Sequence, residues 1–149
     1  MAHYRYFFRM PGDPHEPPPK DPADMPAYIA KHGQRIGELN FGSAEAALFF
    51  DAVDTALGLP ASDLNLGPVY DIWPRDATTG FGGLPREHAE QLSSEIRARI
   101  EVPGNDVELR DAANANDLDE EEFIRRLGSL VRLLDESLKN GGIPATLWE

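Results

Sequence analysis

The chain has 149 residues, of which 26 are acidic and 14 basic, so its formal net charge is −12 at pH 7. This charge disfavours nucleic acid and anionic membranes as partners, and the absence of cysteine excludes disulfides, thiolate metal sites and a cysteine nucleophile. Its length and its content of 41% hydrophobic residues predict a globular protein with one domain over residues 1–149. Because no apolar run reaches about 18 residues and no signal peptide opens the chain, we expect a cytoplasmic location.

The N-terminal part combines a strand pattern with a proline-rich segment. Side chains alternate over residues 3–10, where aromatic residues predict a β-strand. Residues 11–26 hold seven of the thirteen prolines, which excludes a helix or a central strand. We interpret 11–26 as a stiff connector of the polyproline II type, and a ligand for an aromatic groove is the alternative.

Two helices and an extended piece are predicted next. A short helix is expected over 26–33, with Asp24 as a possible cap and Gly33 as its end. Residues 35–41 favour an extended segment, and Ser43 stands where a helix cap is expected. The next helix, 44–57, ends at Gly58, and its apolar residues recur at helical spacing: Ala46, Phe49, Phe50, Val53, Ala56 and Leu57.

The middle of the chain is mostly polar. Residues 61–84 contain one possible strand at 69–73, and Pro85 then suits the first position of a second main helix that runs to Ile100. Two interpretations of residues 102–107 stay open, because this segment either ends the helix or turns a hairpin between 99–102 and 107–110. Residues 111–117 are expected to form a loop.

The C-terminal helix has the clearest start. Asp119 is expected to cap a helix over 120–139, with Glu122 placed as in a capping box, while Leu118 and Phe123 are spaced to form a hydrophobic staple. A strand is expected over 143–148, and Pro144 restricts it to a sheet edge or to the start of the strand. Together these elements predict an α+β fold, a small sheet packed by three main helices.

Two short pieces of the chain each carry part of one pattern. The first piece has a helix cap, an apolar helix and a Leu-Gly-Leu stop, and the second has a late helix followed by a strand that ends in Trp. The pieces are Leu39 to Ser43 with Leu57-Gly58-Leu59, and Leu130 to Leu138 with Ile143 to Trp148. This pattern resembles small uncharacterised bacterial and phage proteins, in which a second Asn often follows the Ser; Ala44 departs from that. The resemblance implies an α+β fold and a bacterial or phage origin, and carries over no activity, cofactor or site residue.

The negative charge lies in two blocks. Residues 41–83 contain six acids against Arg75, and residues 101–122 contain nine acids against Arg110. The simpler interpretation is a solubilising surface. The sharper hypothesis is a protein-binding module, an immunity-type protein or an inhibitor of a basic bacterial or phage protein. Its expected contact residues are the acids Asp51, Asp54, Glu101, Asp106, Glu108 and Asp111, with the aromatic residues Tyr70, Trp73 and Phe81.

Loop 70–86 supports an alternative hypothesis, the binding of a small molecule or nucleotide. Glycines ahead of a helix present backbone N–H groups to an anion, although the same glycines also simply make turns. The candidate anion-binding residues are Arg75, Thr79, Gly80, Gly82, Gly83 and Arg86. A structural or dimerisation subunit is a further alternative. No catalytic motif is present and the four histidines lack metal-site spacing, so we expect no metal or cofactor and favour a non-enzymatic role.

Overall fold

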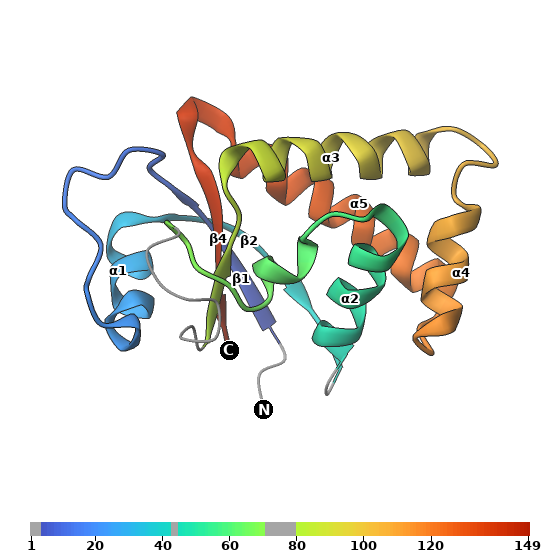
Figure 1. Cartoon of the computed structure of the whole chain (residues 1–149), viewed down its shortest axis with the longest axis horizontal. Coiled ribbons are helices and arrows are strands. Elements are labelled where there is room, and N and C mark those ends of the chain that lie inside the picture. The colour runs from blue at the N-terminus through green and yellow to red at the C-terminus, as the bar shows by residue number, and fades with distance from the viewer. Residues whose placement is uncertain (1–3, 43–44, 71–79) are drawn as a thin grey trace.

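The computed structural model describes residues 4–42, 45–70 and 80–149, which form an α+β fold. Its sheet is antiparallel with strand order β2-β1-β4-β3, and Figure 1 shows α1 to one side of it and the other helices to the other side. The strands are β1 (Tyr4–Met10), β2 (Gln34–Asn40), β3 (Phe81–Gly83) and β4 (Ile143–Trp148). The helices are α1 (Met25–His32), α2 (Glu45–Leu57), α3 (Arg86–Glu101), α4 (Val107–Ala115) and α5 (Glu120–Ser137).

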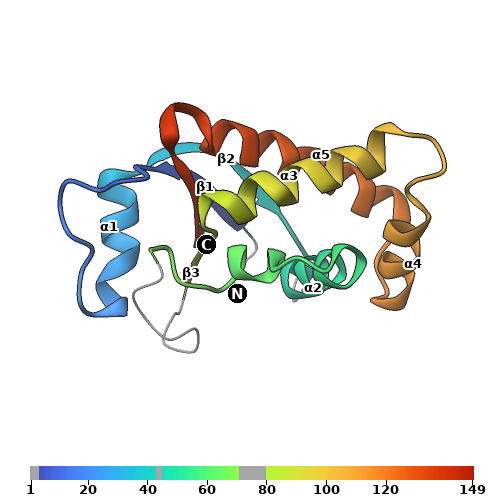
Figure 2. The ribbon, with the colours of Figure 1, turned by 45° about the horizontal axis from the view of Figure 1, so that its top comes forward.

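Strand β1 supplies side chains to both faces of the sheet. Phe7 joins the larger core cluster, which contains the buried side chains of α2, α3, α4 and α5. Phe8 and Met10 join a smaller cluster with Ile29 of α1. Because both faces of the sheet are covered, the neighbouring residues Phe7 and Phe8 are both buried, and the register opposite β2 shifts between them. Figure 2 shows the same separation, with α1 apart from the other four helices.

Most of the predicted elements are confirmed. Strand β1, the extended segment β2, the three main helices α2, α3 and α5, and the final strand β4 lie within a few residues of their expected bounds. Strand β4 lies between β1 and β3, so the edge alternative for Pro144 is wrong and the start alternative is right. The β3–β4 ladder includes Ala145 and does not reach Pro144, so the missing N–H of Pro144 costs no hydrogen bond to β3.

The hairpin alternative for 99–110 and the loop expected at 111–117 are both wrong. Arg99 lies in the last turn of α3, and α4 occupies Val107–Ala115. Leu109, Ala112 and Ala113 are spaced to face one side of this helix, and all three are buried in the larger core cluster. That narrow apolar stripe, flanked by charged residues, was the signal for α4.

The proline-rich connector is shorter than predicted. A 3-10 turn occupies Pro22–Asp24, and α1 begins at Met25. Pro22 and Pro26 lie in the first turns of these segments, where a backbone N–H needs no partner within the helix. The side chain of Asp24 makes no capping bond, whereas Asp21 accepts one from the N–H of Ala23 at 3.0 Å. The short strand forms at 81–83, and Val69 and Tyr70 do not belong to a strand. Residues 71–73 and the expected cap Ser43 lie outside the described residues.

Candidate functional site

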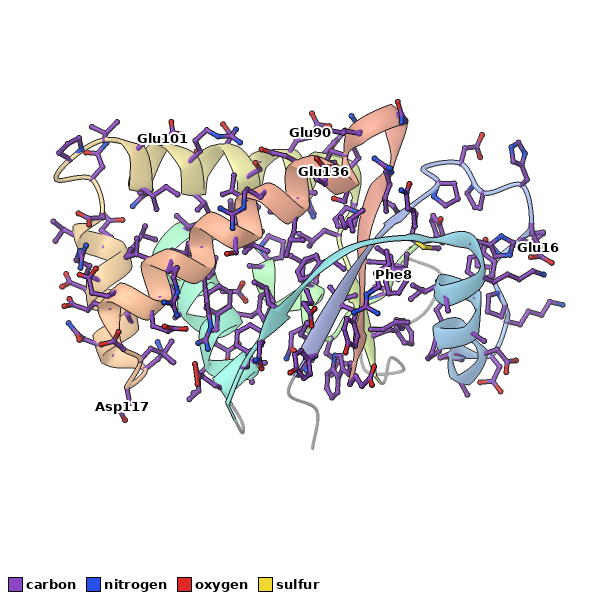
Figure 3. All side chains as sticks on the ribbon, turned by 180° about the vertical axis from the view of Figure 1, so that it is seen from behind. Phe8, Glu16, Glu90, Glu101, Asp117 and Glu136 are labelled. Atoms are coloured by element: carbon purple, nitrogen blue, oxygen red, sulfur yellow. The ribbon has the colours of Figure 1, made fainter. Side chains whose placement is uncertain are left out.

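The acids of the second charge block gather at one end of the molecule. We define the acidic end as residues 101–122, which run from the last residue of α3 through α4 to the first turn of α5. Figure 3 shows Glu101 and Asp117 at this end and Glu16 at the opposite one. Four of the predicted partner-binding residues lie in this segment: Glu101, Asp106, Glu108 and Asp111.

Arginines neutralise part of the acidic end. The Nε of Arg97 lies 3.6 Å from Glu101, and Arg99 pairs with Glu108. Arg110 lies 2.7 Å from Asp106 and 3.0 Å from Glu121, and its hydrogen bond is the main reason that the pKa of Asp106 is lowered. Within the part of the chain that the structure describes, four acids of this end take part in no ion pair: Asp111, Asp117, Asp119 and Glu120.

The two predicted contact acids on α2 differ in role. Asp54 is half-buried and its Oδ1 accepts a hydrogen bond of 2.8 Å from the N–H of Ser62, so it holds the chain just after the helix. Asp51 is exposed, and α2 packs against α4, the central helix of the acidic end. Asp51 therefore remains a candidate contact residue, whereas the structure accounts for Asp54 as part of the fold.

A groove lies between the start of α2 and the turn that joins α4 to α5. It has a volume of about 500 Å³. It is lined by Leu48, which is 40% exposed, and by the buried residues Phe49 and Phe123. The carboxylates of Asp117 and Asp119 also line it. We call this cavity the acidic groove; its lining residues are Glu45, Leu48, Phe49, Asp117, Leu118, Asp119, Glu122, Phe123 and Arg126.

Among the described residues, Arg126 is the one basic residue that lines the acidic groove. Its guanidinium pairs with Glu45 of α2 and lies 3.4 Å from Glu122, one turn earlier on α5. The guanidinium carbon also lies 4.8 Å from the centre of the Phe41 ring, which is cation–π geometry. The groove thus combines four carboxylates with one guanidinium, and its charge remains negative beside its apolar lining residues.

The sequence predicts capping roles for Asp119 and Glu122 and does not predict the groove. That assignment is right for Asp119, whose Oδ2 accepts the N–H of Glu122 at 2.9 Å. The carboxylate of Glu122, however, pairs with Arg125 and Arg126. The signal for the groove was Leu48, a large apolar residue outside the stripe that α2 buries.

The predicted aromatic contact residues lie elsewhere. Phe81 is fully buried in the smaller core cluster. Tyr70 is half-buried, its hydroxyl donates a 2.6 Å hydrogen bond to the carbonyl of Pro11, and burial raises its pKa. Trp73 lies outside the described residues. The structure therefore does not bring Tyr70 and Phe81 together with the acidic end.

The predicted anion-binding residues have structural partners. A Cβ at Gly82 would overlap the carbonyl oxygen of Leu64, so this glycine permits a close backbone approach, and Gly80 has a φ of 77°. Arg86 donates to the carbonyls of Leu138 and Gly142 at 3.0 and 2.9 Å, which closes the C-terminal end of α5. Arg75 and Thr79 lie outside the described residues. A second cavity of about 620 Å³ is lined in part by Tyr70, Gly83 and Arg86.

Neither a metal-binding cluster nor a membrane-spanning helix occurs among the described residues. In residues 4–42, 45–70 and 80–149, no group of three or more histidine, aspartate or glutamate side chains is arranged to hold a metal ion. None of the described helices has the length and apolar character that crossing a membrane requires. No protein-family model, curated protein or solved structure matches the chain.

Proposed function

We propose that the protein is a binding module for a basic protein, of the immunity or inhibitor type, and that the acidic end with its groove makes the contact. The observation that carries this proposal is the exposed Leu48 in the lining of a groove that four carboxylates also line. An acidic surface alone serves solubility, whereas protein interfaces place apolar side chains inside a polar rim.

The charge distribution also has a kinetic consequence for a basic partner. Acids such as Asp111 and Asp117 are exposed and belong to a segment with a formal charge of −8. A localised field of this kind raises association rates by about 10- to 1,000-fold at low ionic strength, and salt screens the effect. We therefore expect association with the partner to slow steeply as salt is added.

The experiment is capture and identification of the partner, followed by binding kinetics with matched charge variants. The pair Asp111→Asn with Asp117→Asn changes the acidic end, and the control pair Asp13→Asn with Asp24→Asn changes the charge equally in the proline-rich segment 11–26. We expect a basic partner, and slower association only for the first pair. An acidic partner, or equal effects of both pairs, would contradict the proposal.

A second candidate is small-molecule binding in the cavity beside Tyr70 and Arg86, which has a volume of about 620 Å³. Pockets of this size hold metabolites and nucleotides. Thermal unfolding of the unmodified protein against a nucleotide and metabolite panel tests this candidate, because a ligand that binds the native state stabilises it. The unmodified protein is required, because Arg86→Ala also removes the contacts to Leu138 and Gly142.

A further inference from the structure

We infer that the acidic groove docks one short motif of the partner, an apolar side chain next to an arginine. This inference rests on the proposed function and specifies which part of the acidic end makes the contact. The two parts of the motif match two features of the groove that lie on different elements. These are the exposed Leu48 of α2, and the carboxylates of Asp117 and Asp119 just before α5.

The apolar half of the motif is inferred from the apolar residues that line the groove. Leu48 is one of four large hydrophobic residues that are exposed among the described residues, and it is the one that lines this groove. Half-buried Leu118 lies on the same surface. An apolar side chain seated here removes part of Leu48 from water, which favours binding in proportion to the area covered.

The cationic half is inferred from how the groove already binds Arg126. The guanidinium of that residue uses Glu45 and Glu122 and contacts the ring of Phe41. Asp117 and Asp119 are exposed and form no ion pair with another described residue. Although Asp119 also accepts the N–H of Glu122, a carboxylate accepts several hydrogen bonds. A second guanidinium, supplied by the partner, matches these two carboxylates, since its planar fork suits carboxylate oxygens better than an ammonium does.

Two peptides of equal charge test the motif on the full chain. The probes are the acetylated tetrapeptide amides Arg-Leu-Gly-Arg and Arg-Ser-Gly-Arg, and the readout is the shift of each backbone amide signal on titration at low salt. We expect shifts at residues 47–49 and 117–119, and roughly three- to tenfold tighter binding of the leucine peptide. Leu48→Ser should remove the difference between the peptides, and an unchanged thermal unfolding midpoint would verify its fold.

Charge variants complete the test. Asp117→Asn should weaken both peptides by about two- to fivefold, and Asp24→Asn, an exposed acid beside α1, should change neither. Shifts confined to residues 101–111, or a leucine preference that survives Leu48→Ser, would overturn the inference and leave the proposed function standing. If neither peptide shifts any amide of the acidic end, the inference fails, whereas the proposed function is decided separately by the captured partner and the kinetics of the charge variants.

Discussion

The guanidinium of Arg126 on α5 forms an ion pair with the carboxylate of Glu45 on α2, 81 residues earlier in the chain. The two side chains are 14% and 30% exposed, so the pair is partly shielded from water. The pair joins α2, which lies in the acidic block 41–83, to α5, whose first turn ends the acidic block 101–122. This one contact forms a wall of the acidic groove and ties together the elements that create it.

Arg126→Ala is therefore expected to destabilise the protein. The substitution leaves Glu45 and Glu122 without their shared cation, which should lower the free energy of unfolding by about 1–3 kcal/mol. Urea denaturation measures the change. Arg125→Ala is the matched control, since Arg125 is 72% exposed and pairs only at the surface with Glu122; its cost should stay below about 0.5 kcal/mol. Equal losses for the two variants would contradict this account.

Asp119→Ala is expected to cost about 1 kcal/mol of unfolding free energy, because the N–H of Glu122 loses its capping acceptor. Asp119→Asn keeps a capping oxygen and should lie within a few tenths of a kcal/mol of the unmodified protein. Hydrogen exchange at Glu122 reports the cap directly and should accelerate for the alanine variant alone. Equal exchange rates of the Glu122 amide in both variants would contradict the capping role of Asp119.

Asp117→Gly should separate stability from binding. Asp117 has a φ of 57°, a left-handed conformation that suits glycine better than a residue with a Cβ. We expect the variant to be more stable by about 0.5 kcal/mol while it binds basic peptides more weakly. Asn140→Gly is the control, because Asn140 has the same φ and lies outside the acidic groove. It should gain stability in urea denaturation and keep its peptide affinity; a parallel loss of affinity would count against the groove.

Gly82→Ala should destabilise the protein by about 2 kcal/mol or more, because the new Cβ overlaps the carbonyl oxygen of Leu64. Gly128→Ala is the opposite case. Gly128 lies inside α5 with no atom near the position of an added Cβ, so the variant should gain about 0.5–1 kcal/mol. Thermal unfolding of the two variants measures both shifts, and a tolerated Gly82→Ala would mean that β3 does not approach Leu64 closely.

Tyr70→Phe should cost about 1 kcal/mol below pH 10, since the carbonyl of Pro11 loses its donor. Burial raises the pKa of Tyr70 above its usual value of about 10, so the folded state favours the protonated phenol. The stabilisation from this group is full below pH 10 and is lost as pH rises further. Denaturation along a pH series checks this. The cost of Tyr70→Phe should shrink at alkaline pH, whereas Tyr4→Phe, which removes no hydrogen bond to a described residue, should cost little throughout.

The elements with strong local signals were predictable. The alternation of residues 3–10, the apolar stripe of α2 and the cap at Asp119 each depend on neighbours within a few residues, and the structure confirms them. Helix α4 was missed because only Leu109 and two alanines mark its buried face. An alanine stripe is weak evidence of a buried face, because the small side chain of alanine adds little to the hydrophobic periodicity of a helix; burial in the core decided the matter.

The sequence by itself determined the α+β class, most helix boundaries and the amount of negative charge, because these depend on local periodicity and on counting. Only the tertiary structure decided that Pro144 belongs to an inner strand, that Phe81 is core and that Arg86 closes α5. It also decided where the charge acts, since Leu48 and Asp117 meet in one groove through the packing of α2 beside the α4–α5 turn. Contacts between segments so far apart in the chain arise from burying a shared core, which no local pattern records.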